Sequence, residues 1–285
     1  MQVIRLNTKT IRQVHPKTPV VMALGFFDGV HRGHQAVLAR ARQIANDRQV
    51  PLAVMTFSRH ASRVFETQPT TDFRYLNTIS QKVALLQKNQ VDLVYLVDFT
   101  RDFAAISPQD FVDTYLLGLN VCGVVGGFDY TFGRGGHTLL SQMAQYSHNR
   151  FTTTVVAEHD AEHRKIGSTA IRHLIRVGHV QRANALLGHP YALAGQLVPV
   201  SGNQFCFKLA SRLQQRPPVG TYRCQVKTAQ GIYPATLMLT PTVVRVTAPQ
   251  LRVATQAGEV AILGQSLPWR PWRHGQRPVI AAWAI

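Results

Sequence analysis

The spacing of hydrophobic residues changes along the chain near residue 190. Before that point, short apolar runs alternate with segments in which apolar residues recur at helical spacing. The apolar runs predict strands over 20–24, 51–57, 92–99, 121–125 and 153–157, and the segments between them predict helices over 34–42, 79–90 and 179–187, with a further helix starting at 107. This alternation predicts an α/β fold with a doubly wound parallel sheet, whose ligands bind at the carboxyl ends of the strands.

Two of the predicted helices carry clear boundary signals. Ser107, Pro108 and Asp110 supply a capping hydroxyl, a proline in the first turn and an acid near the positive end of the helix dipole. Gly188 and Pro190 follow the last helix of this part, as expected for a helix stop. The polar residues 1–19 predict an extended lead-in or an edge strand.

From Tyr191 onward, short apolar segments recur between turn signals, which indicates antiparallel strands. These segments are 192–200, 221–227, 235–239, 243–246, 253–255 and 260–263. They predict a small antiparallel β-barrel or meander of roughly six strands. We therefore expect two domains, residues 1–190 and residues 191–285.

The chain of 285 residues has a formal net charge of +17. Residues 1–195 hold 21 Lys and Arg against 13 Asp and Glu, whereas the remainder holds 10 against 1. Such an excess favours anionic ligands. The basic residues are scattered singly, so we expect a generally basic surface, and nucleic acid is not an expected partner.

Three features bear on the cellular compartment. No apolar run reaches the roughly 18 residues that span a bilayer, and residues 1–7 lack the charged start and apolar stretch of a signal peptide. Cys122, Cys206 and Cys224 have neither metal-ligand spacing nor the even number of a disulfide set. These features predict a cytoplasmic protein without a membrane partner.

The most informative stretch runs from Gly25 to His34 and connects the predicted strand 20–24 to the helix that follows. Glycines let the backbone approach a ligand closely, and the first turn of a helix attracts anions. His31 and His34 can fall on one side of the turn, where each can donate a hydrogen bond to a phosphate oxygen. Because the turn is rich in glycine, we expect neither ring to be deeply buried.

Two later segments add chemistry at other predicted strand ends. Residues 126–136 are rich in glycine and aromatic residues, which suit a planar ring, and Asp129 is their only acid and a candidate Mg²⁺ ligand. In residues 165–172, Ser168 or Thr169 is expected to cap a helix whose N–H groups face phosphate, and Arg172 adds a fork-shaped cation.

The stretch around His31 and His34 resembles the His-X-Gly-His signature of nucleotidylyltransferases, in the long form found in bacterial FAD synthetases. The resemblance implies that both histidines bind the ATP phosphates and stabilise charge as pyrophosphate leaves. It also implies that Gly33 gives the α-phosphate access to the backbone. The resemblance also assigns Gly25, Phe26 and Phe27 of this turn to cofactor binding, although Phe26 stands where the family usually has a small or polar residue.

The same resemblance extends to three later segments. His60 matches the histidine that the family places after its second strand, near the nucleotide phosphates. The family's flavin- and metal-binding segment implies a flavin site at Gly127, Phe128, Asp129, Tyr130 and Phe132 and a metal site at Asp129. The family's second signature implies that Ser168, Thr169 and Arg172 contact the nucleotide phosphates.

Beyond residue 190 the resemblance is architectural and implies a riboflavin kinase barrel. Phosphoryl transfer to a hydroxyl needs bound metal and usually a carboxylate base. The family's metal-binding stretch has no counterpart in residues 201–220, and Glu259, the one acid of this part, is expected in a turn. We expect a degenerate kinase barrel.

The sequence therefore predicts an FMN adenylyltransferase that makes FAD and pyrophosphate from FMN, ATP and Mg²⁺. One alternative is a bifunctional enzyme that retains riboflavin kinase activity. A second is a related enzyme that adenylylates or cytidylylates another phosphate ester. A third is a flavin-responsive regulatory protein that binds nucleic acid through its barrel. The sequence leaves the oligomeric state open.

Overall fold

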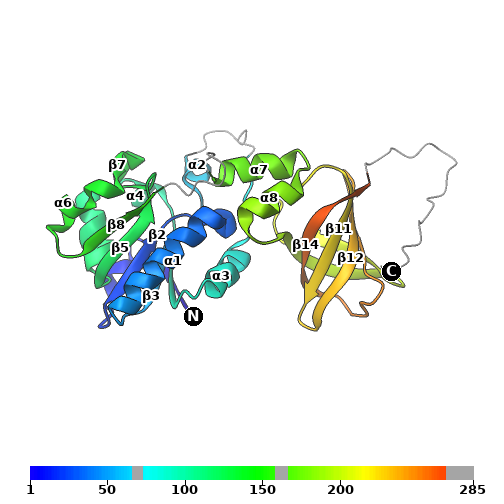
Figure 1. Ribbon diagram of the computed structural model, residues 1–285, viewed down its shortest axis with the longest axis horizontal. Coiled ribbons are helices and arrows are strands. Elements are labelled where there is room, and N and C mark those ends of the chain that lie inside the picture. Colours follow the sequence, from blue (N-terminus) through cyan, green and yellow to red (C-terminus); the bar gives the residue numbers. More distant parts are fainter. Residues whose placement is uncertain (66–72, 158–165, 268–285) are drawn as a thin grey trace.

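The computed structural model describes residues 1–65, 73–157 and 166–267. An α/β sheet forms one end of the molecule and a β-barrel the other, with helices α7 and α8 between them (Figure 1). This arrangement confirms the fold class predicted from the sequence.

The sheet has six strands, all parallel, in the order β1-β4-β3-β2-β5-β8. Their bounds are β1 Gln2–Leu6, β2 Val20–Leu24, β3 Leu52–Phe57, β4 Leu93–Val97, β5 Val121–Gly127 and β8 Thr152–Val156. The predicted strands are confirmed, and the polar lead-in supplies the edge strand β1. Strand order reverses beside β2, so the segments after β2, β3 and β5 leave neighbouring strand ends, as ligand sites of such sheets require.

Helices cover both faces of this sheet because its central strands are apolar on both sides. Alternate residues of a strand face opposite sides, so Val21 and Ala23 pack with α1 and α3, whereas Met22 and Leu24 pack with the helices of the 101–147 segment. The helices of this part are α1 Arg32–Asp47, α2 Ala61–Val64, α3 Ile79–Lys88, α4 Arg101–Ala104, α5 Pro108–Phe111 and α6 Met143–Ser147, with a π-helical turn over Val112–Leu117 and short 3₁₀ turns over Thr10–Gln13, Asp28–Val30, Arg134–Gly136 and Leu140–Gln142.

Of the helix ends predicted from the sequence, the start of α5 and the end of α8 are confirmed and the cap of α7 is not. The Ser107 side chain accepts a hydrogen bond from the Asp110 N–H, so the predicted cap is confirmed. Gly188 ends α8 (Val180–Leu187) in the left-handed conformation, with φ 75°. The predicted hydroxyl cap of α7 (Ser168–Arg176) is wrong: the N-cap is Gly167, which has no side chain to bond.

The second part is a closed antiparallel barrel in the order β10-β13-β12-β11-β14-β9. Its strands are β9 Tyr191–Ser201, β10 Gln204–Leu209, β11 Gly220–Thr228, β12 Gly231–Leu239, β13 Val244–Thr247 and β14 Gln256–Leu267. The sequence missed β10, and its predicted strand over 253–255 is wrong. The turn predicted for Glu259 is also wrong: this residue lies within β14, paired with Lys227 of β11 and Ala194 of β9.

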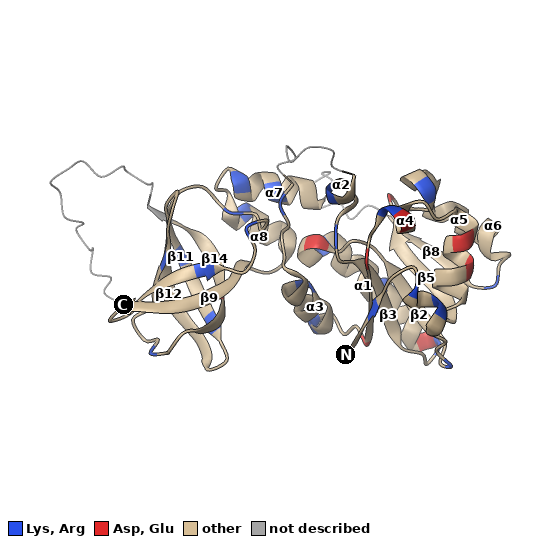
Figure 2. Ribbon diagram, turned by 180° about the vertical axis from the view of Figure 1, so that it is seen from behind, with Lys and Arg blue, Asp and Glu red and all other residues tan. Residues whose placement is uncertain are grey.

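The two helices between sheet and barrel share the hydrophobic core of the barrel. Ile171 and Ile175 of α7 and Leu187 of α8 belong to one buried cluster with barrel residues such as Tyr222 and Val260. Lys and Arg are scattered over the described residues of both the sheet and the barrel (Figure 2). Within the described ranges, no helix is both long and apolar enough to cross a membrane.

Candidate active site

The glycine-rich turn after β2 adopts an unusual backbone path. Phe27, Gly29 and Val30 all have positive φ values, of 53°, 83° and 39°. A Cβ atom at residue 29 would lie 2.7 Å from Leu76 Cδ1, so both the conformation and the packing require glycine there. The turn is thereby held against the segment before α3.

His31 and His34 stack on each other at the start of α1. Their ring centroids are 3.6 Å apart and their planes differ by 18°. His31 is the N-cap of α1, and its Nδ1 accepts a hydrogen bond of 3.3 Å from the His34 N–H. The neutral His31 ring therefore carries its proton on Nε2, where it can donate to a ligand.

Both histidines are held in the neutral form. Burial lowers the pKa of His31 to about 4, partly offset by the Asp129 carboxylate. Burial also lowers the pKa of His34, and the neighbouring His31 adds to the effect. His31 is only 5% exposed, so the expectation that neither ring is deeply buried is wrong for this residue. Its capping bond draws the ring inward.

Gly33 leaves space for the His31 ring. A Cβ atom at Gly33 would lie 3.3 Å from the His31 ring, so glycine lets the ring occupy its position. In the described part of the chain, Nδ1 of His34 is buried without a hydrogen-bond partner. The start of α1 therefore combines two neutral imidazoles with the Arg32 and Gly33 N–H groups of the first helix turn, which have no hydrogen-bond partner among the described residues, and this combination suits an anion.

Asp28 connects this turn to α7. Its carboxylate is 1% exposed, accepts hydrogen bonds from the Leu76 and Asn77 N–H groups, and pairs with the Arg172 guanidinium at 2.7 Å. The Ser168 hydroxyl, which does not cap its helix, donates 2.9 Å to the Asp28 carbonyl. The two segments singled out in the sequence therefore meet through Asp28.

A cavity of about 690 Å³ opens beside the histidines. Of the predicted site residues, those that line it are Gly25, Phe26, Phe27, His31, Gly33, His34, His60, Gly127, Phe128, Asp129, Tyr130, Phe132 and Ser168. Thr169 is exposed and does not line the cavity, and Arg172 is turned to Asp28. One space thus collects residues from the ends of β2, β3 and β5 and from the start of α7.

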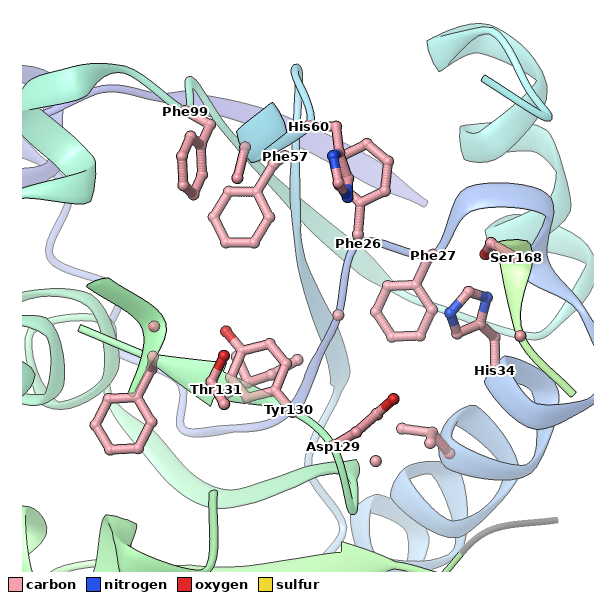
Figure 3. A pocket seen from close by; sticks show the side chains of 18 of the residues that line it. Phe26, Phe27, His34, Phe57, His60, Phe99, Asp129, Tyr130, Thr131 and Ser168 are labelled. Atoms are coloured by element: carbon pink, nitrogen blue, oxygen red, sulfur yellow. The ribbon is translucent and has the colours of Figure 1, made fainter. Parts of the chain in front are cut away.

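One wall of this cavity is aromatic. Phe57 and Phe99 lie across from Tyr130, with Asp129 pointing toward His34 (Figure 3). The ring of Phe57 lies 5.4 Å from those of Phe99 and Phe103. The cavity therefore has an apolar part that suits a planar ring and a polar part at the histidines.

Asp129 is the predicted metal ligand and lies exposed on the loop after β5. No group of three His, Cys, Asp or Glu that could hold a metal gathers among the described residues. Mg²⁺ commonly binds through one or two carboxylates together with substrate phosphates. A single accessible carboxylate beside the histidines fits that mode.

His60 lies inside a column of stacked groups. Its ring packs on Phe73 at 4.3 Å and edge-on to Phe26 at 4.9 Å, and the Arg172 guanidinium covers the other face of Phe73 at 4.3 Å. Burial, and then the charge of Arg172, lower the pKa of His60. The column holds His60 at the cavity while keeping it neutral.

Two sets of residues at the site were not predicted from the sequence. The first is the aromatic wall of Phe57, Phe99 and Phe103, whose residues read as ordinary core positions. The second is Lys82, which is 3% exposed and whose burial lowers its pKa to about 8. A signal for Lys82 was present: it occurs four residues before the buried Leu86, on the apolar face of α3.

A second cavity, of about 660 Å³, lies between α3 and the barrel. Lys82, Gln81 and Phe26 contribute from the sheet side, and Lys227 and Glu259 from the barrel side. Phe26 lines both cavities.

Comparison with known proteins identifies relatives for both parts of the chain. A family model described as FAD synthetase matches residues 13–170. The chain is 43% identical over 197 residues to a bifunctional riboflavin kinase/FMN adenylyltransferase of Listeria monocytogenes, a match that covers 67% of this chain and 62% of that relative. It is 34% identical over 240 residues to a protein of the same description from Bacillus subtilis, with 79% of this chain and 75% of the relative covered.

A solved structure shares this fold. A crystal structure described as a macrolide-efflux protein of Streptococcus pneumoniae matches with a TM-score of 0.81 and 26% identity, covering 92% of this chain and 90% of that one. The family match spans more than half of the chain and contains the turn with both histidines. The chain therefore belongs to the FAD synthetase family.

Proposed function

We propose that this protein is an FMN adenylyltransferase, which makes FAD and pyrophosphate from FMN and ATP, and that it does not phosphorylate riboflavin. The observation that carries the proposal is a single cavity that joins an aromatic wall to a pair of neutral histidines at a helix start. A flavin ring suits the first part, and nucleotide phosphates suit the second. The FAD synthetase family implies the same two substrates.

In the proposed reaction, a phosphate oxygen of FMN attacks the α-phosphorus of ATP. A new P–O bond forms, the bond from the α-phosphorus to the bridging oxygen breaks, and pyrophosphate leaves. FMN phosphate is already an anion, so positioning and charge stabilisation matter more than proton removal. His31 and His34 donate to phosphate oxygens, and Gly33 leaves room for close backbone approach.

The second signature supports this arrangement from α7. Ser168 lies at the cavity and holds the Asp28 carbonyl. Arg172 stabilises the turn through Asp28 and adds positive charge near the phosphates. We assign Thr169, at the exposed start of α7, to the outer rim of the nucleotide site.

We propose Asp129 as the residue that holds Mg²⁺ in this site. When bound, Mg²⁺ neutralises charge on the nucleotide phosphates. The exposed position of Asp129 and its electrostatic effect on His31 support this assignment. The residues of the same loop, Gly127, Phe128, Tyr130 and Phe132, are assigned to the flavin.

The absence of kinase activity is proposed from the chemistry of the barrel. The chain from Tyr191 onward contains one carboxylate, Glu259. Transfer of the ATP γ-phosphoryl group to a hydroxyl needs a metal site and a base. The family's metal-binding stretch has no counterpart in residues 201–220, so the barrel lacks the metal site that this transfer needs.

One observation favours the second candidate function, a bifunctional enzyme that retains riboflavin kinase activity. Glu259 lies in β14 and lines the second cavity beside Lys227, where a base could meet a ligand. The relatives from Listeria and Bacillus are described as bifunctional. The remaining alternatives, a different phosphate ester or a nucleic-acid partner, have no comparable support.

A product analysis separates these functions. The protein is incubated with ATP and Mg²⁺, and with either FMN or riboflavin, and the products are identified chromatographically. The proposal expects FAD from FMN and no product from riboflavin. FMN or FAD formed from riboflavin would establish the bifunctional enzyme, and no FAD from FMN would overturn the adenylyltransferase.

A further inference from the structure

Lys82 is a buried lysine on α3 whose ammonium group points into the protein at the ends of two strands. Its Nζ donates to the Phe26 carbonyl at 2.8 Å, the Thr56 hydroxyl at 3.3 Å and the Phe57 carbonyl at 3.3 Å. It also lies 3.9 Å from the centroid of the Phe26 ring. An ammonium has three N–H donors, so all of them are used within the protein.

These contacts join the two places where the site segments leave the sheet. Phe26 follows β2 and precedes the turn that carries His31, and Phe57 is the last residue of β3, just before the segment with His60. The Thr56 hydroxyl donates to the same Phe26 carbonyl at 2.8 Å. One cation and one hydroxyl therefore hold this carbonyl in place.

Holding the Phe26 carbonyl also holds the Phe27 N–H, because both belong to one planar peptide group. The peptide bond is planar and trans, so the Phe27 N–H points opposite to the Phe26 C=O. In the described residues, this N–H has no hydrogen-bond partner within the protein. Rotation of this peptide plane would change the left-handed conformation of Phe27. The turn that carries His31 would then move with it.

A buried ammonium is a costly way to fill this space. Removing a charge from water carries a large desolvation penalty, which carbonyl and hydroxyl acceptors offset in part. A methionine would fill similar volume over the Phe26 ring without that penalty. What methionine lacks is the ability to hold two carbonyl groups in fixed orientation.

We propose that Lys82 is a positioning residue for adenylyl transfer: it holds the Phe26–Phe27 peptide and the end of β3 so that the histidine turn keeps its reactive geometry. This proposal rests on the proposed function of the first cavity. It assigns Lys82 no contact with substrate. Its effect passes through the Phe26 carbonyl.

The principal test replaces Lys82 with methionine. A small displacement of a phosphate-binding turn costs up to about 10²-fold in rate, so Lys82→Met should lower kcat for FAD synthesis roughly 10- to 100-fold. The KM for FMN should change less than kcat, because Lys82 bonds the backbone of Phe57 and the Phe57 ring keeps its packing on Phe99 and Phe103. Lys88→Met is a matched change at an exposed position at the end of α3 and should leave kcat and the KM for FMN unchanged.

Two further variants distinguish positioning from general loosening of the fold. Thr56→Val removes the other donor to the Phe26 carbonyl with little change in volume, and should likewise lower kcat more than it changes the KM for FMN. Leu86→Ala weakens the packing of α3 without touching the carbonyl, and should lower the Tm but not kcat. If Lys82→Met fails to fold, Thr56→Val carries the test.

A readout without catalysis separates this proposal from the proposed function. Hydrogen exchange at the Val30 amide, which donates to the Phe27 carbonyl in the histidine turn, should accelerate at least tenfold in Lys82→Met and not in Leu86→Ala. That result would support Lys82 even if the wild-type protein made no FAD, which would overturn only the function. Unchanged kcat, unchanged exchange, or an equal loss in Leu86→Ala would overturn the positioning role.

Discussion

Asp28 and Arg172 lie 144 positions apart in the sequence and form an ion pair of 2.7 Å between the first turn of the site and α7. The carboxylate is 1% exposed and the guanidinium side chain 15% exposed. Asp28 also accepts hydrogen bonds from the Leu76 and Asn77 backbone. The pair therefore ties together three segments that are distant in the chain.

Neutralising Asp28 should destabilise the whole protein. In Asp28→Asn, Arg172 keeps its charge in a largely buried place without a counterion, and breaking such a pair costs about 3–5 kcal/mol. Urea unfolding should show this loss. The exposed Asp113–Arg150 pair provides the control, since Asp113→Asn should cost no more than about 1 kcal/mol. Equal losses in the two variants would refute a special role for the buried pair.

Replacing either histidine should slow FAD formation. Loss of one preorganised donor to a developing charge costs about 10²- to 10³-fold in kcat, and we expect this for His31→Ala and His34→Ala. His31→Ala should also lower the Tm, because the buried His31 ring caps α1. His15→Ala, at an exposed position outside the cavity, is the control. Near-normal turnover in both site variants would contradict the assignment of these histidines to the nucleotide phosphates.

The neutral state of His31 should appear in the pH dependence of stability. Its pKa is about 4 in the folded protein, against an ordinary value of 6.5 that applies to the unfolded chain. Between pH 4 and 6.5 the unfolded chain therefore binds more protons at this residue than the folded one. The free energy of unfolding should therefore fall as the pH drops from 6.5 to 4, by roughly 3 kcal/mol from this residue. Urea titrations at several pH values should give a shallower slope for His31→Gln than for the wild type.

Asp129 should affect the metal requirement. Asp129→Ala should raise the Mg²⁺ concentration needed for half-maximal FAD synthesis, and Asp129→Asn should raise it less, because the amide carbonyl can still coordinate. The measurement is a Mg²⁺ titration at saturating ATP and FMN. The same Mg²⁺ dependence in both variants and the wild type would make Asp129 a structural loop residue.

Glu259 should be dispensable for FAD synthesis from FMN. It lies on the barrel side of the second cavity, away from the histidine cavity. Glu259→Gln should therefore convert FMN to FAD at the wild-type rate. If the wild type forms FMN from riboflavin and Glu259→Gln does not, the barrel is an active kinase and Glu259 its base.

The sequence alone determined the alternating α/β pattern, the antiparallel second part and the segments that meet at the site. Strong local signals account for this. Short apolar runs such as Val20–Leu24 favour buried central strands, and a turn that combines several glycines with two histidines is specific to few kinds of site. Two of the failures have different causes. Strand β10 carries a local signal that the sequence analysis missed, since Phe205, Phe207 and Leu209 recur at every second position. The strand state of Glu259 depends on pairing with Lys227 and Ala194, which no local signal reveals.

Only the tertiary structure decided how the site residues act on one another. The pairing of Arg172 with Asp28 and the hydrogen bond from Lys82 to the Phe26 carbonyl join segments distant in the sequence. Local composition fixes which residues can carry chemistry. Burial and long-range contacts fix their charge state and orientation, because desolvation and hydrogen bonding depend on what the folded chain places beside each group.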